Sequence, residues 1–376
     1  MKAQLSTWLQ SMLCAVVCAS TTLIVAQPVQ LVQPGQAVQA APTPKLGVFY
    51  FPGWKNGALG LAYPQPWEPI KRFPARQPLL GWYDEGQVPV MEQHLAWMAS
   101  HALDYVVFDW YWGGERPVLD HALKAYRAST GKAKVKYAVM WANHEEQAAP
   151  AAHIVAMVEH LSRNHFTTPE YLKVNGKPLL FIMEPGKVDR SAIAAGINHR
   201  QLNERFQAAA RAMGLPGIML VGGANGGVNG VTQNAKAWGY SAYFIYTYGA
   251  GLDGMTRQQP RVAHSYEEFD ENYREHWDWF MKNTDLPYVL PMTSGFDRSP
   301  WGGSADSKHD LSSSTIEQFT RHITAGRDLI RREPSKTMNM GLLCCWNEFG
   351  EGSYIEPTKG QGMSYLRAVK SVFGQP

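Results

Sequence analysis

The chain has 376 residues, of which 45% are hydrophobic and 18% charged, so it can bury a large core and is not a disordered polypeptide. Its 35 Lys and Arg nearly balance its 32 Asp and Glu, which leaves a net charge of +3. That balance argues against a nucleic-acid partner. The 13 Trp and 17 Tyr suit either a large core or platforms on which flat apolar ligand faces stack.

The N-terminal residues are interpreted as targeting and linker sequence. Met12–Ala26 is uncharged, mostly apolar and ends in small residues, and it is shorter than the ~20 apolar residues of a membrane span. It therefore predicts a signal peptide over residues 1–26, with an uncleaved anchor facing the periplasm as the alternative. Residues 27–44, rich in Gln, Pro and Ala, predict a flexible linker. We expect one domain over residues 45–376 and an exported protein, either periplasmic or secreted.

Short apolar runs alternate along the rest of the chain with segments whose apolar residues recur every three or four positions. The expected strands are Leu46–Phe51, Asp104–Trp110, Val135–Trp141, Pro178–Glu184, Gly217–Gly222, Ser241–Thr247, Leu286–Met292 and Gly341–Asn347. The expected helices include Val88–His101, Ala151–Arg163, Arg200–Met213, Tyr266–Met281, Thr315–Arg331 and Met363–Phe373. Repeated βα units with apolar strands predict a single-domain α/β fold, the (β/α)8 TIM barrel.

A doubly wound open sheet is the alternative fold, and it predicts a nucleotide-binding glycine fingerprint after the first strand. Phe51–Gly57 (FPGWKNG) is not such a fingerprint. The first βα connection instead runs long, from about Pro52 to Gln87, and is rich in Trp, Tyr and Pro. Long ordered loops of this kind usually carry function.

Polar and aromatic residues stand where most of the expected strands end, and barrel enzymes carry their chemistry at that end. Carboxylates, amides and aromatic planes at one mouth are what a carbohydrate site requires. The residues expected to bind substrate are Tyr50, Trp54, Asp109, Trp110, Trp141, Asn143, Glu184, Tyr246, Tyr248, Trp346, Asn347 and Glu356. For each, the alternative is a structural role: acids that cap loops, and tryptophans that belong to the core.

The end of the eighth strand carries the candidate catalytic pair. Glu348 and Glu351 are three residues apart on a turn with Gly350 and Gly352. Two acids close together in a partly enclosed mouth acquire different proton affinities, so one can act as base and the other as acid. Glycoside cleavage needs this division of labour. We expect Tyr50, Asp109, Trp141, Asn143 and Tyr246 to line one pocket with this pair.

Other chemistries lack a motif. No paired histidine spacing of a zinc site and no Gly-x-Ser-x-Gly elbow occurs, so no metal and no cofactor are expected. Cys344 and Cys345 are adjacent, and on a strand adjacent side chains point to opposite faces. We therefore do not expect these two cysteines to bond to each other.

The segment Trp346–Pro357 (WNEFGEGSYIEP) resembles the Trp-Asn-Glu-Trp-x-Glu-Gly-x-x-Ile-Glu-Pro signature of glycoside hydrolase family 99 and its WbsX-like relatives. The stretches that agree in order are Phe49–Pro52, Gly81–Asp84, Asp104–Trp112, Trp141–Asn143 and Tyr171–Leu180. The resemblance implies a (β/α)8 barrel and endo-acting cleavage of α-mannosides with retention and without metal. It also implies that Glu348 removes the proton of the sugar 2-hydroxyl, which gives a 1,2-anhydro sugar, and that Glu351 protonates the leaving group and later activates water.

Two departures from the family pattern bear on the substrate. His144 follows Asn143 where WbsX-like members usually have Glu, and Phe349 replaces the Trp after the first motif glutamate. Both positions would line sugar subsites, so they affect which sugar binds more than which reaction occurs.

The sequence therefore predicts an exported, endo-α-mannosidase-like glycoside hydrolase. Its expected partner is an α-linked polysaccharide or oligosaccharide, either mannan-like or a bacterial surface polysaccharide or exopolysaccharide, and neither nucleic acid nor a membrane. One alternative is a glycan-binding or glycan-processing protein of polysaccharide biosynthesis without hydrolytic turnover. The other is a glycosyltransferase, a label that WbsX-like proteins have received, although no nucleotide-sugar motif is recognisable here.

Overall fold

The computed structural model describes residues 43–144, 148–252 and 261–374. The expected signal peptide, residues 1–26, lies outside these ranges, and so does all of the expected linker except residues 43–44. Within the described ranges, no helix is both long enough and apolar enough to cross a membrane.

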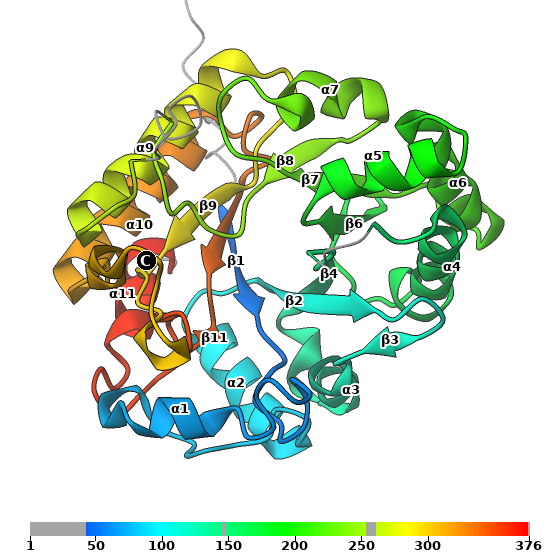
Figure 1. The fold of residues 1–376 in the computed structure, drawn as a ribbon. Helices are drawn as coiled ribbons and strands as arrows, with labels where there is room; N and C mark the ends of the chain where they lie inside the picture. The colour runs from blue at the N-terminus through cyan, green and yellow to red at the C-terminus, as the bar shows by residue number, and fades with distance from the viewer. Residues whose placement is uncertain (1–42, 145–147, 253–260, 375–376) are drawn as a thin grey trace, which may run out of the picture. The chain divides into compact units, whose positions relative to one another are not determined.

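Eight parallel strands form a barrel inside a ring of helices, as Figure 1 shows in a view down the barrel. The barrel strands are β1 (Lys45–Tyr50), β2 (Tyr105–Trp112), β4 (Lys136–Trp141), β6 (Lys177–Ile182), β7 (Met219–Gly223), β8 (Ala242–Phe244), β9 (Leu290–Thr293) and β10 (Met340–Cys344). Their order is β8-β7-β6-β4-β2-β1-β10-β9. The ring closes between β8 and β9, where Tyr243 N donates to Pro287 O (2.8 Å) and Val289 N donates to Tyr243 O (2.9 Å). The (β/α)8 TIM barrel expected from the sequence is confirmed.

The helices cover the outside of the strands because each presents one apolar face. They are α1 (Trp67–Lys71), α2 (Val88–Ser100), α3 (His121–Ala128), α4 (Ala151–Leu161), α5 (Pro185–Ala194), α6 (His199–Ala212), α7 (Gly230–Trp238), α9 (Tyr266–Asn283), α10 (Ile316–Arg332) and α11 (Ser364–Phe373). α10 illustrates the local logic. Thr315 and Gln318 form a capping box at its start, and the helix buries Phe319, Ile323 and Ile330, each stabilising the fold by roughly 1.5–3 kcal/mol.

Four short strands lie outside the barrel: β3 (Pro117–Val118), β5 (Lys173–Val174), β11 (Asn347–Glu348) and β12 (Ser353–Tyr354). β11 and β12 form an antiparallel pair in which Glu348 faces Ser353. The eighth barrel strand therefore ends at Cys344, and the glutamate-bearing segment that follows is a small hairpin at the barrel mouth.

Candidate active site

A cavity of about 530 Å³ opens at the carboxyl end of the barrel strands. Its walls come from the ends of β1, β2, β4, β6 and β8 and from the loops after β9 and β10. It is lined by Phe51, Tyr63, Asp109, Tyr111, His144, Met183, Tyr246, Thr247, Arg298, Trp301, Glu348 and Glu351. Both predicted catalytic glutamates are thus in one cavity, together with Asp109 and Tyr246.

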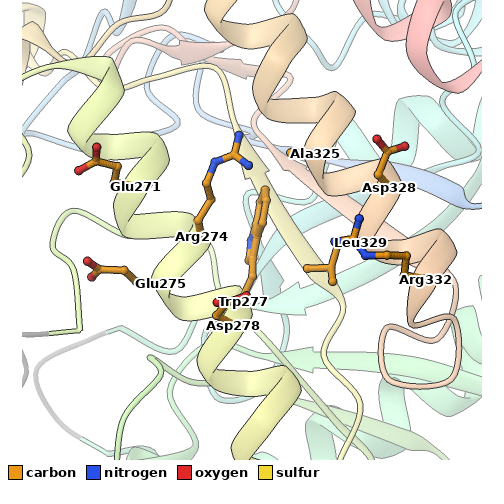
Figure 2. Close-up of a pocket in the computed structure, with 9 residues that line it drawn as sticks. All are labelled: Glu271, Arg274, Glu275, Trp277, Asp278, Ala325, Asp328, Leu329 and Arg332. Atoms are coloured by element: carbon orange, nitrogen blue, oxygen red, sulfur yellow. The ribbon is translucent and has the colours of Figure 1, made fainter.

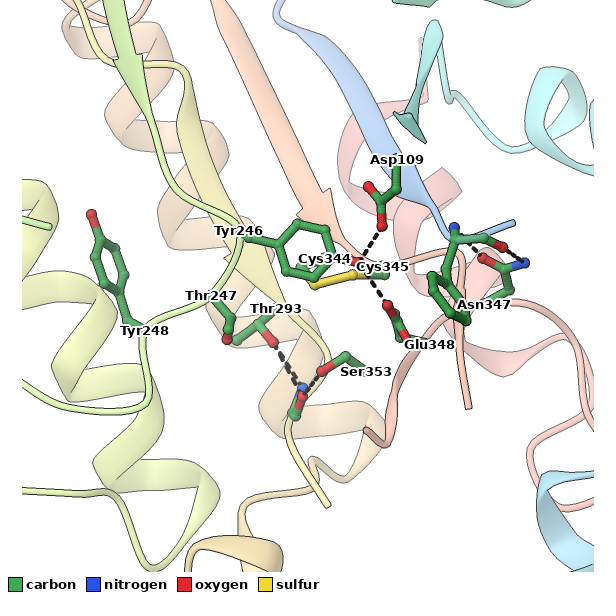
Figure 3. Close-up of a disulfide and its surroundings, with 12 residues drawn as sticks. Asp109, Tyr246, Thr247, Tyr248, Thr293, Cys344, Cys345, Asn347, Glu348 and Ser353 are labelled. Atoms are coloured by element: carbon green, nitrogen blue, oxygen red, sulfur yellow. Dashed lines mark hydrogen bonds between the residues drawn. A yellow bond between two sulfur atoms is a disulfide. The ribbon is translucent and has the colours of Figure 1, made fainter. Parts of the chain in front are cut away.

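One tyrosine hydroxyl joins two of the acids. The Tyr246 hydroxyl lies 2.9 Å from Asp109 Oδ2 and 2.9 Å from Glu348 Oε1, as Figure 3 shows. A hydroxyl has a single hydrogen, so it can donate to only one of these oxygens. The second contact becomes a full hydrogen bond when that carboxyl group carries a proton and donates to the tyrosine oxygen. The three side chains therefore form a proton-sharing unit across the barrel mouth.

Burial raises the pKa of each acid in this cavity. Glu348 is only 7% exposed, and burial, followed by the charges of Glu351 and Asp109, raises its pKa well above 4.5. Burial likewise raises the pKa of Asp109 well above 3.8. For Glu351, burial raises the pKa while the charge of Arg298 opposes the rise. An acid with a raised pKa holds its proton more firmly than usual, which suits it to general acid–base catalysis.

Glu348→Gln is expected to stabilise the fold at high pH. In the unfolded chain the Glu348 carboxyl group ionises near the ordinary pKa of a glutamate. In the folded chain it keeps its proton to a higher pH, because its pKa is raised. Between those two pKa values the folded state binds more protons, so the wild type loses stability as pH rises. Thermal melts should give the variant the higher Tm at about pH 8, with the difference gone near pH ~4.

The matched control for this melt is Glu92→Gln. A backbone hydrogen bond from Thr130 lowers the pKa of the Glu92 carboxyl, so that group stabilises the fold above its ordinary pKa and the sign of the effect reverses. Equal pH dependence in both variants would contradict the burial argument for Glu348.

The glutamate hairpin is pinned against the loop after β9. A Cβ atom added at Gly350 would lie 1.0 Å from Trp301 Nε1, and Gly352, at φ +69°, packs on Asp297. Asp297 N also donates to Glu351 O (2.7 Å). Only glycine lets the Trp301 indole, which lines the cavity, lie against the chain between the two glutamates.

Gly350→Ala is expected to destabilise the protein by about 1–3 kcal/mol, because the indole of Trp301 must move to admit the methyl group. Urea unfolding measures this change, and the activity proposed below should fall with it. The control is Gly186→Ala, since an added Cβ there meets nothing nearer than 4.0 Å. Equal stability of the two variants would show that Trp301 can move freely.

Several predicted substrate-binding residues lie behind the cavity wall. Adjacent side chains along a strand face opposite ways, so Phe51 lines the cavity while the preceding Tyr50 is fully buried, with its hydroxyl 3.1 Å from His94 Nδ1 on α2. Three more predicted residues also point away from the cavity. Trp110 stacks on Trp112, Tyr248 stacks on His276 with ring centroids 3.7 Å apart, and Trp346 packs on His94 with ring centroids 5.3 Å apart. The expectation that Tyr50 lines the pocket is wrong.

A second group lies beside the cavity and holds its loops. Trp141 and Asn143 line a separate small hollow next to α5. The Asn143 amide bonds the main chain of Glu184 (3.0 and 2.8 Å), and the Glu184 carboxylate pairs with Lys187 (3.3 Å). The expectation that Trp141 and Asn143 share the pocket of the glutamates is therefore also wrong, because their side chains face the helix layer.

Three further predicted residues brace the first and last strands. The Asn347 amide bonds both Phe51 N and Phe51 O (2.9 Å each). Trp54 Nε1 donates to Asn347 O (2.9 Å). The fully buried Glu356 accepts from the Tyr83 hydroxyl (2.6 Å) and lies 3.2 Å from His94 Nε2. These contacts fix the segment that carries Glu348.

The sequence did not single out most of the remaining cavity wall. The unpredicted residues are Phe51, Tyr63, Tyr111, Met183, Thr247, Arg298 and Trp301, whereas the cavity position of His144 agrees with its expected place at a sugar subsite. For Phe51, Tyr111 and Thr247, strand-end position was a usable signal, because each neighbours a residue that was predicted. Tyr63 and Trp301 come from long loops and meet only in the fold, with ring centroids 4.2 Å apart.

The expectation that Cys344 and Cys345 do not bond is contradicted, since the structure joins them in a disulfide. That expectation assumed an extended backbone with a trans peptide bond, whereas the peptide bond between Cys344 and Cys345 is cis. Both cysteines are buried, and Figure 3 shows the disulfide near Tyr246, Asp109 and Glu348.

Metal-ligand atoms gather at one place among the described residues. Asp84, Glu85 and His121 can offer atoms within 4.8 Å of one another. Glu85 Oε1 accepts from Trp54 N and lies 2.8 Å from His121 Nε2, contacts that tie the first βα connection to α3. None of the three lines the cavity of the glutamates, and the expected absence of a metal stays a prediction.

Another hollow, of about 590 Å³, lies between α9 and α10 in the helix layer (Figure 2). Charged side chains such as Glu271 and Arg332 line it, and Arg274 pairs with Asp270 (2.9 Å). Because its lining comes only from these two helices, it lies away from the strand ends where barrel enzymes act.

Comparison with known proteins identifies the family of this chain and structures of similar fold. The family model described as "Glycosyltransferase WbsX" matches residues 71–369. No curated protein matches the sequence. A solved structure titled "Glycoside hydrolase-like protein" is 14% identical and covers 92% of this chain and 98% of its own, with a TM-score of 0.65.

The GH99 endo-alpha-mannosidase from Bacteroides thetaiotaomicron is also similar in structure. Its complex with bis-tris-propane is 12% identical, covers 87% of this chain and 96% of its own, and gives a TM-score of 0.59. A second structure of that enzyme gives 0.53 at 14% identity, with 87% and 95% covered. At these identities the likeness is one of fold. Because the family model spans most of the sequence, the chain belongs to the WbsX family.

Proposed function

We propose that this protein is a glycoside hydrolase that cleaves an α-linked polysaccharide, mannan-like or a bacterial surface polysaccharide or exopolysaccharide, with retention and without metal. The observation that carries the proposal is the placement of Glu348 and Glu351 in one cavity at the strand ends. The raised pKa values of the two acids suit proton transfer. Residues 45–376 would form the catalytic domain.

The proposed reaction has two steps. Glu348 removes the proton of the sugar 2-hydroxyl, and that oxygen attacks the anomeric carbon while Glu351 protonates the departing glycosidic oxygen. The products are a 1,2-anhydro sugar and the released chain. Glu351, now ionised, then removes a proton from water, which opens the three-membered ring at the anomeric carbon. Glu348 returns its proton to the 2-oxygen, and two inversions give net retention.

Tyr246 and Asp109 support the base in this scheme. If Asp109 holds the shared proton, it donates to the tyrosine oxygen, and the tyrosine hydrogen is free to bond an ionised Glu348. Asp109 Oδ1 is buried without a hydrogen-bond partner among the described residues, which makes an ionised Asp109 costly. The arrangement thus favours Asp109 as the protonated member and Glu348 as the carboxylate.

A panel of α-linked glycans tests the proposal, with product stereochemistry followed by NMR and all assays run in EDTA. Release of α-configured products by the wild type, and not by Glu348→Gln, would support it. The family description favours one alternative, a glycosyltransferase. Consumption of a nucleotide sugar without hydrolysis of any glycan would establish that alternative. Tight glycan binding without either reaction would indicate a binding protein.

We also propose export, because Met12–Ala26 has the proportions of a secretory signal. The mature chain should begin between about Ser20 and Lys45, where the signal ends and the domain starts. Mass spectrometry of periplasmic and secreted fractions checks this. An intact Met1 in exported material would indicate the uncleaved N-terminal anchor instead.

A further inference from the structure

A separate hollow of about 400 Å³ lies on the first βα connection. All of its lining residues fall between Trp54 and Asp84, the stretch whose length and aromatic content set it apart in the sequence. No step of the proposed reaction uses it. Of its tryptophans, Trp54 and Trp67 are buried and Trp82 is partly exposed.

The tryptophans form a continuous line from this hollow to the cavity of the glutamates. The ring centroids of Trp82 and Trp67 are 5.2 Å apart, and Trp67 stacks on Trp54 at 4.1 Å. Trp54 then meets the edge of Trp301 at 6.4 Å, and Trp301 lines the cavity of the glutamates. The two hollows are therefore neighbours that share an aromatic wall.

Hydrogen bonding distinguishes Trp82 from the tryptophans beneath it. Trp67 Nε1 donates to Tyr83 O (2.7 Å) and Trp54 Nε1 donates to Asn347 O (2.9 Å). The Trp82 indole N–H donates to none of the described residues. The exposed amides of Asn56 and Gln65 line the same hollow, and in the described part of the chain their side chains also lack hydrogen bonds.

The charge of the hollow is balanced. Lys71 pairs with Glu68 (2.5 Å), and the remaining charged lining residues are Lys55 and Asp84. A neutral ligand with one apolar face and several hydroxyl groups matches such a lining, because the face can stack on an indole while amide and carboxylate groups bond the hydroxyls. Neutral sugars have this chemistry.

We infer that this hollow is a second carbohydrate-binding subsite, in which Trp82 stacks on a sugar unit and Asn56 and Gln65 bond its hydroxyls. The inference rests on the proposed function in one respect: the occupant is a more distant unit of the polysaccharide whose cleavage is proposed at Glu348. Because the two hollows share an aromatic wall, one polysaccharide chain can reach both. A long polysaccharide would then bind more tightly than a short oligosaccharide.

Affinity electrophoresis in gels that contain yeast α-mannan, and in parallel gels with the other polysaccharides of the panel, tests the subsite. Glu348→Gln serves as the parent so that the gel is not digested. Adding Trp82→Ala should weaken the affinity roughly tenfold, whereas adding Trp279→Ala, a partly exposed tryptophan on α9, should leave the retardation of the parent unchanged. Since Trp82 packs against buried rings, the exposed pair Asn56→Ala/Gln65→Ala provides a second test without risk to the fold.

Equal retardation of the parent, the Trp82 variant and the amide variant would overturn the subsite, and so would the absence of retardation in every gel. The fate of the proposed function is read separately, from hydrolysis by the wild type. Retardation that depends on Trp82 without any hydrolysis would leave the subsite standing and remove the glycosidase proposal. Hydrolysis by the wild type, with binding that does not depend on Trp82, would support the glycosidase proposal and overturn the subsite.

Discussion

Glu351→Gln is expected to lower kcat/KM on the natural polysaccharide by about 100-fold or more, and far less on an activated aryl or fluoride glycoside. A general acid matters most when the leaving oxygen is poor, since an activated group departs with little protonation. Glu351 lines the cavity, and burial raises its pKa, so it can hold the proton that a poor leaving group requires. Kinetics on one good and one poor leaving group measure the difference.

Glu348→Gln should lower kcat/KM by the same factor on good and poor leaving groups, because removal of the 2-hydroxyl proton does not depend on the leaving group. Substrates without a free 2-hydroxyl should not turn over at all. The control is Glu204→Gln, an exposed acid paired with Arg200 on α6 (3.2 Å). Equal, modest losses in the Glu348 and Glu351 variants would mean that these acids only bind sugar. Asp109 would then be the next candidate, since Glu184 lies outside the cavity lining.

The barrel could be predicted because its strands are nearly continuous apolar runs between amphipathic helices. The first expected strand, Leu46–Phe51, differs from β1 by one residue at each end. The largest error is at the start of the seventh strand, which was expected at Leu286 whereas β9 begins at Leu290. The next largest errors are at strand ends beside the site. The sixth strand was expected to continue to Thr247, but β8 ends at Phe244. Apolar character alone does not reveal where the backbone of a strand stops hydrogen bonding to its neighbours in the sheet.

The meeting of Glu348 and Glu351 in one cavity could be predicted because two acids on a glycine-containing turn follow an apolar strand. The cavity wall could be predicted only in part, since one residue of register decides which side chain faces the mouth. Tyr50 was expected there and Phe51 took the place. Partners from distant loops, such as Tyr63 and Trp301, leave no local pattern, because their meeting depends on the path of two long connections.

Arg76→Gln is expected to destabilise the fold by roughly 3–5 kcal/mol, the cost of breaking a buried ion pair. Arg76 is buried, and its guanidinium pairs with the Asp297 carboxylate. Nη1 also donates to Asp297 O (3.0 Å) and to Phe349 O (2.9 Å). Phe349 lies between the two glutamates in the chain, so this one side chain fixes the acid hairpin to the loop after β9.

Activity should fall with stability, because a hairpin free to shift no longer holds Glu348 and Glu351 at the sugar. Arg76→Lys keeps the charge but not the planar fork that reaches a carboxylate and two carbonyl groups together, so it should recover only part of the loss. Arg200→Gln breaks an exposed pair with Glu204 and should cost less than about 1 kcal/mol. Urea unfolding and kcat/KM on the same preparations measure both effects. If Arg76→Gln behaves like Arg200→Gln in both measurements, the glutamate hairpin is held by its own turn and by Trp301, without help from the first βα connection.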